Sequence, residues 1–378
     1  MKILTLNHEF PPVGGGASPV TFELCTELVR QGHTVDVVTM HYKNTPNFEN
    51  INGINIYRTP ALRKSPNICH PHELATYLPG AFLKTLSLAK KNKYDIIHCH
   101  FIVPGSPLAW LISNLTGIPF IVTCHGSDVP GHNPDRFILL HKIIKPLWKF
   151  FARKAEVIIT PSKFLKQKVL QVDQTLKVEV IPNGLDISRF NTNEKTKSIL
   201  LCSRIFKFKG MQYFIEAVKD LQLGWEINII GDGPYLPELK ALAGNSKTPI
   251  KFHGWLDKNS KEYINLYSEA SIFIFLSEAE SFGLVVAEAM AAGCAIIASD
   301  IPAHREVLGD TGIFVEACNA GLIKTALEKL ISDEKLRQDF QKQTRGRVCE
   351  KFSWDKIADE YVKLYENYVR KTNAERIS

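Results

Sequence analysis

Residues 2–39 read KILTLNHEFPPVGGGASPVTFELCTELVRQGHTVDVVT and decide the fold of the first half of the chain. Lys2 to Leu6 is an apolar run typical of a buried strand, and a turn with two prolines and three glycines follows it. A helical pattern then runs from Ser18 to Arg30, Gly32 ends it, and a second strand is expected from Thr34 to Thr39. This order is the opening of a parallel sheet, with the glycine-rich turn at the carboxyl end of its first strand.

Further short apolar runs alternate with helical patterns along both halves of the chain. The expected strands are Ile96 to His100, Phe120 to Cys124, Val157 to Thr160, Val178 to Ile181, Ser198 to Ser203, Trp225 to Ile230, Ile250 to His253, Ile272 to Leu276 and Ala295 to Ser299. Strands that alternate with helices predict the α/β class, here as two Rossmann-like, doubly wound domains.

A change of composition after residue 181 marks the boundary between the two domains. Pro182 to Asp186 is turn chemistry, and residues 188–198 are polar with several Asn and Thr. A chain of 378 residues is also long for one hydrophobic core. We therefore expect a first domain over residues 1–180 and a second over 181–353, with an amphipathic helix over 354–378 that crosses back to the first.

Positive charge is concentrated in the first half. The first 179 residues hold 20 Lys and Arg against 12 Asp and Glu, whereas the remainder holds 26 against 27. This imbalance suggests that the first half meets something anionic, such as a membrane surface, a lipid phosphate or an acidic glycan. Nucleic acid is not expected as a partner, because no helix carries dense Lys and Arg and no recognised binding motif is present.

Cysteine usage and hydropathy favour a cytoplasmic protein. The eight cysteines are scattered without a C-x-x-C pair, as is typical of reduced thiols. Residues 98–100 read His-Cys-His, but the usual spacing of zinc ligands is absent, so no metal site is expected. No apolar run approaches the ~18 residues of a membrane span, and His8 and Glu9 come too soon for a secretory signal.

Two carboxylates eight residues apart, Glu280 and Glu288, flank the expected start of a helix in residues 277–293, SEAESFGLVVAEAMAAG. Backbone N–H groups and the helix dipole favour a phosphate at such a start. Glu288 lies two turns into an otherwise apolar helix and needs hydrogen-bond donors, which vicinal sugar hydroxyls would supply. The pair suggests a nucleotide-sugar site. The alternative is one Glu favoured by the dipole and a second solvated on an outer face.

Seven short motifs occur in an order that resembles a known family. They are GGG at 14–16, HGSD at 125–128, IPNGLD at 181–186, R-x4-KG at 204–210, GDGP at 231–234, E-x7-E at 280–288 and FSW at 352–354. Together they resemble the retaining GT-B glycosyltransferases of family 4, also called group 1. The resemblance implies two Rossmann-like domains facing across a cleft. It also implies transfer of a hexosyl group from a nucleotide-diphosphate sugar to a glycan or lipid-linked acceptor, in cell-surface polysaccharide or glycolipid synthesis.

For the second domain, the resemblance implies that Glu288 binds the ribose of the donor and Glu280 its sugar. Arg204 and Lys209 would hold the diphosphate, whose charge grows as the glycosidic bond breaks. A solvated basic strand end is the alternative for these two cations. The other donor-binding residues expected are Gly231, Ser281, Phe282, Gly283 and Leu284.

For the first domain, on the acceptor side, the resemblance implies that His125 orients hydroxyls near the reacting centre; the alternative is a core histidine satisfied by backbone. Asp128 would orient the acceptor or His125, although Gly-Ser-Asp is also common in turns and helix caps. Gly15 and Gly16 would let backbone approach the donor, with a plain tight turn as the alternative. The expected catalytic residues are thus His125, Glu280 and Asp128.

The resemblance also implies a mechanism. Retention would proceed on one face of the sugar, with a donor phosphate oxygen helping to take the acceptor proton, so no carboxylate pair of the glycosidase kind is needed. The chain has no D-x-D, so protein cations would serve where other transferases use a divalent metal. Neither cofactor nor metal is expected, and the nucleotide sugar is a substrate.

Residues 137–154, FILLHKIIKPLWKFFARK, interleave basic residues with aromatic and aliphatic ones, although Pro146 interrupts them. Such a helix is typical of a membrane interface, and would place the protein peripherally on the inner face of an anionic membrane. A packed helix with a solvated basic face is the alternative.

Two other classes of protein are kept as alternatives. A GT-B-fold nucleotide-sugar 2-epimerase would use the same cleft without an acceptor, and would be expected to lack the E-x7-E pair. The other is a catalytically inactive binding protein. The joint presence of His125, Arg204, Lys209, Glu280 and Glu288 argues against it.

Overall fold

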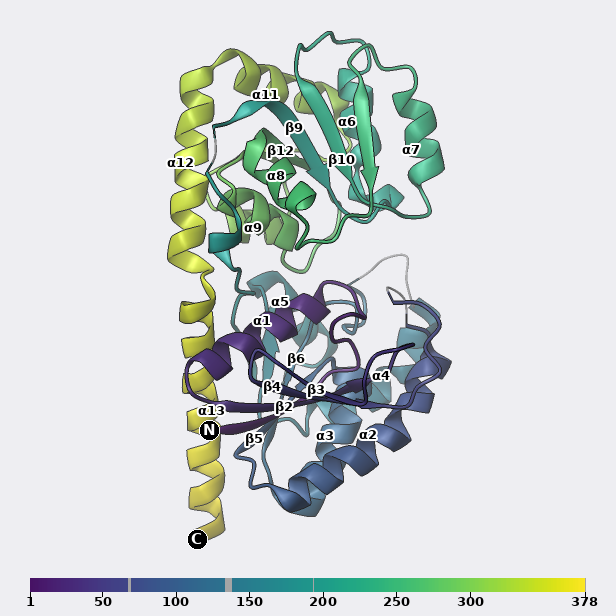
Figure 1. Ribbon diagram of the computed structural model, residues 1–378, viewed down its shortest axis with the longest axis vertical. Helices are drawn as coiled ribbons and strands as arrows, with labels where there is room; N and C mark the ends of the chain where they lie inside the picture. Colours follow the sequence, from purple (N-terminus) through teal and green to yellow (C-terminus); the bar gives the residue numbers. More distant parts are fainter. Residues whose placement is uncertain (67–68, 133–137, 193, 378) are drawn as a thin grey trace. The chain divides into compact units, whose positions relative to one another are not determined.

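The computed structural model describes residues 1–66, 69–132, 138–192 and 194–377, which form two compact units. Unit 1 comprises Met1–Gly184 and Trp354–Ser378, and unit 2 comprises Leu185–Ser353. Each is a largely parallel sheet with helices on both faces (Figure 1). The predicted α/β class, with two Rossmann-like doubly wound domains, is confirmed.

Unit 1 contains an eight-stranded sheet in the order β3-β4-β2-β1-β5-β6-β7-β8. Its strands are β1 (Lys2–Leu6), β2 (Thr34–Met40), β3 (Phe48–Ile51), β4 (Ile54–Thr59), β5 (Ile96–His100), β6 (Phe120–Thr123), β7 (Ile158–Thr160) and β8 (Val178–Val180). Its helices are α1 (Ala17–Arg30), α2 (Pro71–Lys91), α3 (Ile102–Thr116), α4 (Ile138–Ala152), α5 (Lys163–Val172) and α13 (Trp354–Ile377). Among these strands, β3 alone is antiparallel to its neighbour.

The two faces of the unit 1 sheet are covered by different helices. Alternate residues of the central strands, such as Leu4 and Ile97, pack with α2, α3, α4 and α5 in one hydrophobic cluster. The opposite face meets α1 and α13, which lie side by side (Figure 1). There Trp354 Nε1 donates to Glu23 Oε2 at 2.5 Å, and the Tyr365 hydroxyl lies 2.8 Å from His98 Nδ1. The last helix is therefore built into the layer that covers β5.

Unit 2 contains a six-stranded parallel sheet in the order β11-β10-β9-β12-β13-β14. Its strands are β9 (Thr196–Cys202), β10 (Glu226–Ile230), β11 (Ile250–Gly254), β12 (Ala270–Phe275), β13 (Ala295–Ser299) and β14 (Ile313–Val315). Its α-helices are α6 (Met211–Val218), α7 (Leu236–Ala243), α8 (Lys261–Glu269), α9 (Leu284–Ala291), α10 (Pro302–Leu308), α11 (Ala320–Ser332) and α12 (Glu334–Lys351). Two short 3₁₀ helices, η1 (Ile187–Arg189) and η2 (Lys207–Lys209), flank β9.

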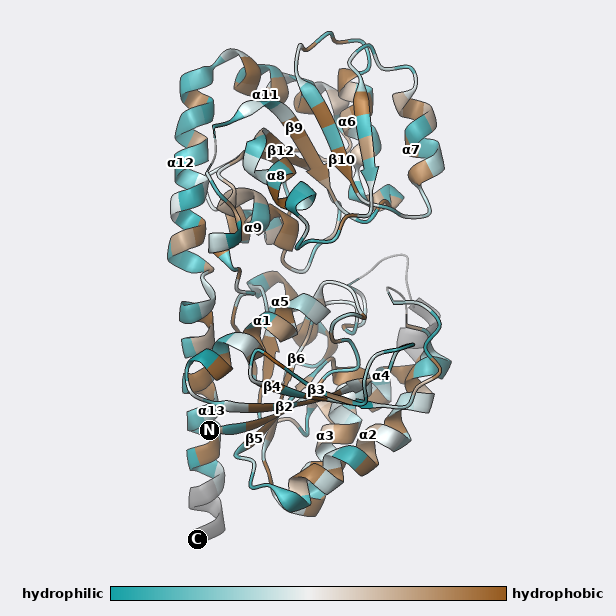
Figure 2. Cartoon of the chain, in the orientation of Figure 1, coloured by the Kyte–Doolittle hydropathy of each residue, from teal (hydrophilic) through white to brown (hydrophobic). Residues whose placement is uncertain are grey.

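The unit 2 sheet is buried on both faces. Leu200 packs in the cluster with α8, α9 and α12, and its neighbour Leu201 packs in the cluster with α6, α7 and α11. A strand buried on both sides needs apolar residues at every position rather than at every second one. Figure 2 shows β12 and the second half of β9 hydrophobic, whereas α12 is largely hydrophilic.

Both sheets reverse their strand order beside the first strand, between β1 and β5 and between β9 and β12. In doubly wound sheets, ligands bind at the carboxyl ends of the strands near this reversal. The loops after β1, β5, β6, β9, β10 and β12 all lie at these edges. These loops, together with η2 and the helix α9 that follow two of them, contain the residues that the sequence singled out for a site.

Three local features did not follow from the sequence. Helix α2 begins at Pro71 and continues through Pro79. Proline at the first helical position is favourable, since its missing N–H has no partner there in any case. Pro146 likewise lies inside α4 instead of ending it. The β3–β4 hairpin was not predicted, although Asn52-Gly53 between its strands is a typical hairpin turn.

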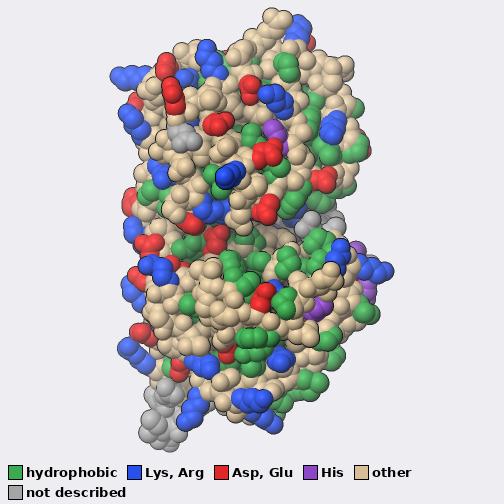
Figure 3. Space-filling model, in the orientation of Figure 1, with side chains coloured by type: hydrophobic (Ala, Val, Ile, Leu, Met, Phe, Trp, Pro, Cys, Tyr) green, Lys and Arg blue, Asp and Glu red, His purple; other side chains and the backbone are tan. Residues whose placement is uncertain are grey.

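Surface charge is mixed on the face that Figure 3 draws. Lys and Arg side chains are interspersed there with Asp and Glu and with hydrophobic side chains. The excess of positive charge in the first half of the sequence is therefore not gathered into one continuous patch on this face.

Candidate functional site

Glu280 and Lys209 form an ion pair at the carboxyl edge of the unit 2 sheet. The Lys209 ammonium, on η2 after β9, contacts Oε1 of Glu280 in the loop after β12, and both side chains are largely buried. Burial is the largest influence on the Glu280 carboxyl and acts to raise its pKa, but the Lys209 charge and hydrogen bond hold that pKa below its ordinary value. Removing Lys209 would leave a buried carboxylate unpaired, so its loss would weaken folding as well as any ligand contact.

Glu288 is 2% exposed and is bound by the protein's own donors. Lys258 Nζ lies 2.8 Å from Oε1, and the Tyr263 hydroxyl lies 2.8 Å from Oε2. From the sequence, sugar hydroxyls were expected to satisfy this carboxylate. In the structure Lys258 and Tyr263 satisfy it without a ligand. Neither was predicted, because no local spacing connects them to Glu288. A carboxylate accepts about four hydrogen bonds, so Glu288 keeps capacity for a ligand.

The first turn of α9 presents backbone donors at the end of β12. Gly283, its N-cap residue, has φ 94° and no side chain that could accept from the first N–H groups. Phe282 is buried against Phe352, with ring centroids 5.4 Å apart, and Leu284 packs against the same core cluster. The buried Phe282 therefore has mainly backbone atoms to offer a ligand, whereas the side chain of Ser281 is half-buried beside this turn.

Gly231 and Arg204 lie where β10 and β9 end. Gly231 has φ 143°, and a Cβ there would lie 1.9 Å from the Ser203 carbonyl oxygen, so glycine is needed for the two strand ends to approach. Arg204 is exposed, with its guanidinium carbon 5.6 Å from the centre of the Phe206 ring. The structure thus brings Arg204, Gly231, the Lys209–Glu280 pair and the first turn of α9 to one edge of unit 2.

His125 belongs to a row of four histidines, with His8, His98 and His100, at the carboxyl edge of the unit 1 sheet. Its Nε2 lies 3.0 Å from Nδ1 of His100, whose ring centroid is 4.4 Å from that of His98. Burial, and then the neighbouring His8, lower the pKa of His125 to about 3, and burial likewise lowers the pKa of His98 to about 3. Both rings are therefore neutral at pH 7.

His98 and His100 were missed as neighbours of the site, although the sequence carried the signal. Their motif was considered only for adjacent zinc ligands, whereas residues two apart on a strand point to the same face. Both rings therefore lie on the face of β5 that α1 and α13 cover. Within the described residues, no group of three or more His, Cys, Asp or Glu is arranged to hold a metal ion. Across those same residues, no helix combines the length and apolarity that a membrane span requires.

Asp128 binds backbone N–H groups at the loop after β6. Its Oδ2 accepts from Ile102 N at 2.9 Å, at the start of α3, and its Oδ1 accepts from His125 N at 3.1 Å and Gly126 N at 3.2 Å. Burial raises the pKa of this carboxyl, and these hydrogen bonds oppose the rise. These contacts are of the turn and helix-cap kind that the sequence analysis gave as the alternative role of Asp128. They also hold the backbone of His125 in place.

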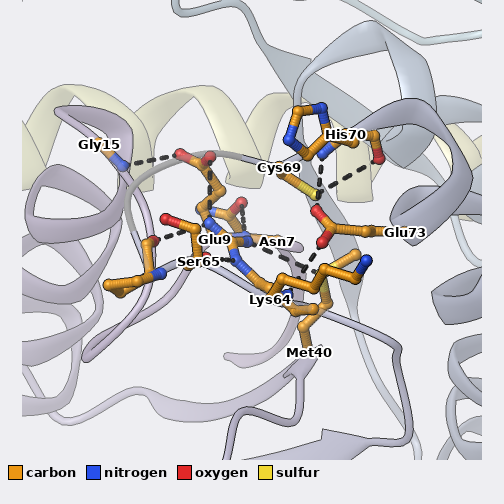
Figure 4. Close-up of polar contacts among 11 residues, drawn as sticks. Asn7, Glu9, Gly15, Met40, Lys64, Ser65, Cys69, His70 and Glu73 are labelled. Carbon is orange, nitrogen blue, oxygen red and sulfur yellow. Dashed lines mark hydrogen bonds and ion pairs between the residues drawn. The ribbon is translucent and has the colours of Figure 1, made fainter.

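The glycine-rich turn after β1 is tied to neighbouring loops (Figure 4). Gly15 N donates to Glu9 Oε2 at 3.0 Å, and Gly14 N donates to the Pro66 carbonyl at 2.8 Å. Glu73 accepts from Lys64 N and His70 N and so holds the loop after β4 (Figure 4). Because Glu9 occupies the Gly15 N–H, a ligand phosphate would have to displace this carboxylate to use it.

Conformation requires only one of the three glycines. Gly14 has φ 116°, and a Cβ there would lie 2.7 Å from the Cβ atoms of Glu9 and Ser18. A Cβ on Gly15 would meet nothing closer than 4.0 Å, and Gly16 has an ordinary helical φ of −62°. The two predicted glycines, Gly15 and Gly16, are therefore the two that the turn itself does not need.

We expect Gly14→Ala to lower the free energy of unfolding by about 1–3 kcal/mol, because it forces a side chain into a left-handed conformation with overlap. The matched change Gly15→Ala should stay within about 0.5 kcal/mol of the wild type. Urea unfolding followed by circular dichroism measures both. Equal losses in the two variants would contradict this account of the turn.

Comparisons with known proteins find glycosyltransferases that match both halves of the chain. The model of Glycosyltransferase Family 4 matches residues 14–189, and that of Glycosyl transferases group 1 matches residues 185–347. An uncharacterized glycosyltransferase of Methanocaldococcus jannaschii is 30% identical, over 97% of this chain and 98% of its own length. The alpha-monoglucosyldiacylglycerol synthase of Streptococcus pneumoniae is 28% identical, over 80% of this chain and 71% of its own.

A solved structure shares the fold across both units. The Anabaena protein HepE, crystallised in complex with UDP-glucose, has a TM-score of 0.76 with 18% identity, over 97% of this chain and 100% of the other. At that identity the likeness bears on the fold alone, and it agrees with two doubly wound sheets in one chain. From these matches together, the chain belongs to the GT-B glycosyltransferases of family 4.

Proposed function

We propose that this protein is a retaining, metal-independent hexosyltransferase. Its donor is a nucleotide-diphosphate sugar, and its acceptor is a glycan or lipid-linked molecule used in cell-surface polysaccharide or glycolipid synthesis. The observation that carries the proposal is the edge of unit 2. Three cations, Arg204, Lys209 and Lys258, lie there with two carboxyl side chains and the first turn of a helix, at the carboxyl ends of neighbouring parallel strands.

The diphosphate has three sources of positive potential at this edge. Arg204 is exposed after β9, Lys209 is on η2, and the first turn of α9 directs N–H groups out of the helix. When the bond between sugar and phosphate breaks, charge accumulates on the leaving diphosphate, and fixed donors stabilise that charge without reorganising. Lys209 is largely buried, so the more exposed Arg204 is the cation that a ligand can reach first.

The two carboxylates have distinct proposed partners. Glu288 is anchored by Lys258 and Tyr263 and would accept from the ribose hydroxyls. Glu280, held ionised by Lys209, would accept from hydroxyls of the transferred sugar. A carboxylate fixed by a second residue loses little further freedom on binding, which favours its use as an orienting group.

Relatives support the donor and acceptor classes. HepE was crystallised with UDP-glucose, and the pneumococcal relative is named for a glucosylated diacylglycerol. We therefore propose a nucleotide sugar as the donor and include lipid acceptors beside glycans.

We expect nucleoside diphosphates and their sugar conjugates to raise the melting temperature of the full chain, since a ligand stabilises the state that binds it. Arg204→Met should weaken that binding by about 10- to 100-fold, because a charge-assisted hydrogen bond contributes roughly 1.5–3 kcal/mol. Lys207→Met, which removes an exposed charge from η2 three residues after Arg204, is the matched control and should stay within about threefold. Isothermal titration measures all three proteins.

Product analysis of the same mixtures tests the reaction class. Sugar transfer, or slow donor hydrolysis that retains the anomeric configuration, supports the proposal. An epimerised nucleotide sugar would establish the isomerase instead. Binding without any product would establish the inactive protein.

The proposed chemistry needs no divalent metal, because Arg204, Lys209 and the α9 N–H groups supply the positive charge. We expect turnover to stay unchanged in EDTA. Loss of turnover in EDTA that magnesium or manganese restores would show that a metal carries part of the diphosphate charge. Product formation in metal-depleted buffer, followed by NMR of the anomeric proton, is the measurement.

We also propose that unit 1 docks on an anionic membrane through α4. Ile143, Leu147 and Phe150 recur at helical spacing and are 69%, 50% and 45% exposed, while Trp148 of the same helix is fully buried. Lys145 of the same helix is also exposed. Apolar side chains that face solvent among basic ones are typical of a helix lying in a lipid interface. Such docking would bring a lipid-linked acceptor to the enzyme.

Co-sedimentation with vesicles containing anionic lipid should pellet the wild-type protein. The double variant Lys145→Glu with Leu147→Glu should reduce binding at least tenfold, since each basic residue near such a surface contributes about 1 kcal/mol. Leu322→Glu, at a 47% exposed leucine on α11, is the matched control and should bind as the wild type does. Binding that survives the α4 changes would refute this docking face.

A further inference from the structure

We infer that a chain of hydrogen bonds, beginning at the backbone of Glu9, fixes His125 as the tautomer protonated on Nδ1. His125 then offers a substrate a hydrogen-bond donor and keeps no ring lone pair free to take a proton. His100 is the positioning residue that imposes this state. The role of His125 toward substrate rests on the proposed function, whereas the tautomer follows from contacts within unit 1.

The first hydrogen bond in this series has a donor that cannot act as an acceptor, the backbone N–H of Glu9. Glu9 N lies 2.9 Å from Asn7 Oδ1, and a backbone N–H can only donate (Figure 4). The oxygen of the Asn7 amide therefore faces Glu9, and its nitrogen faces Thr21 Oγ1 at 2.8 Å. An amide nitrogen only donates, so Thr21 accepts from Asn7.

Thr21 has one proton, and a second backbone group takes it. The Thr21 hydroxyl donates to the Ala17 carbonyl at 2.8 Å, since a carbonyl can only accept. One lone pair of Thr21 Oγ1 remains, and His100 Nδ1 lies 3.4 Å away. If Nδ1 of His100 carried no proton, its lone pair would face the lone pair of Thr21 Oγ1, which is unfavourable. Nδ1 of His100 therefore carries the proton.

His100 passes this constraint to His125. Burial lowers the pKa of both imidazoles well below 6.5, so each ring holds a single proton at pH 7. His100 Nδ1 lies 3.0 Å from His125 Nε2, closer than it lies to Thr21, and donates there. Because Nε2 of His125 accepts, the single proton of His125 is on Nδ1.

The opposite arrangement is unfavourable for a second reason. If His125 donated from Nε2, the proton of His100 would lie on its own Nε2. That atom is buried and has no hydrogen-bond partner among the described residues. Buried N–H groups without an acceptor are rare in folded proteins, so the orphaned position is better left as a bare acceptor.

The assigned tautomer limits what His125 can do. Its lone pair is occupied by His100, so it cannot remove the proton of an acceptor hydroxyl. Its Nδ1–H can donate to a hydroxyl or phosphate oxygen. His125 is therefore assigned as a donor that orients an oxygen, and the base must be another group.

Nitrogen-15 NMR of the wild-type full chain, labelled in its histidine rings, measures the tautomer directly. His125 is identified among the 12 histidines by the signals that disappear in His125→Asn. We expect a protonated Nδ1 and a bare Nε2 for His125 at pH 7, and a protonated Nδ1 for His100. A protonated Nε2 on His125 would overturn the inference whether or not the protein transfers sugar.

Substitutions at His100 test the positioning role. His100→Leu removes the donor, so signals of both His125 tautomers should appear and kcat should fall about tenfold with little change in the donor KM. His100→Asn restores a donor near the Nδ1 position, and it should recover the single tautomer and most of the lost kcat. An unchanged spectrum and kcat in His100→Leu would refute the role.

Thr21→Val provides an independent test, because it removes the lone pair that faces His100 and keeps the side-chain shape. It should also produce a mixture of His125 tautomers, and a single Nδ1–H tautomer in this variant would refute the part that Thr21 plays. If His100→Leu does not fold, as judged by its thermal melt, the wild-type spectrum and Thr21→Val decide the matter. Failure of the wild type to bind any donor would count against the proposed function and would leave the tautomer assignment untouched.

Discussion

Parallel pairing of strands is the constraint on which the structure depends. When neighbouring strands run the same way, their carboxyl ends meet at one edge, and every connecting helix must begin from that edge. In unit 2 this gathers the loops after β9, β10 and β12. In unit 1 it gathers those after β1, β5 and β6. Residues separated by up to about a hundred positions thus become neighbours without any special interaction between them.

The two edges handle buried polar groups differently. Unit 2 pairs its carboxylates with lysines, Glu280 with Lys209 and Glu288 with Lys258, which suits a site that binds an ionic ligand through exchange of partners. Unit 1 keeps its histidines uncharged by burial, and a hydrogen bond joins His100 to His125. A row of charged histidines would repel one another, so neutrality is what allows four of them to stand so close. The polar groups at the edge of unit 2 are therefore held by ion pairs, and the histidines at the edge of unit 1 are neutral hydrogen-bonding groups.

The fold could be predicted from the sequence because the deciding patterns are local. The apolar runs of β9 and β12 and the glycine turn after β1 each act within a few residues, and their order along the chain gives the sheet. The partners of the site residues could not be predicted in the same way. Tyr263 and Lys258 contact Glu288 from another part of the sequence. Glu9 contacts Gly15 through a turn whose backbone angles cannot be derived from its residue types. Where the argument needed a ligand to satisfy Glu288, tertiary structure supplied a tyrosine and a lysine.

The place of α13 has a consequence for how the chain is made. Unit 1 contains the first 184 residues and also the last helix, whose Tyr365 satisfies His98 and whose Trp354 binds Glu23. A ribosome delivers these partners only after all of unit 2 has been synthesised. Until then the face of β5 that carries the histidines lacks part of its cover. During synthesis, unit 1 therefore lacks part of the cover of its sheet until α13 has been made.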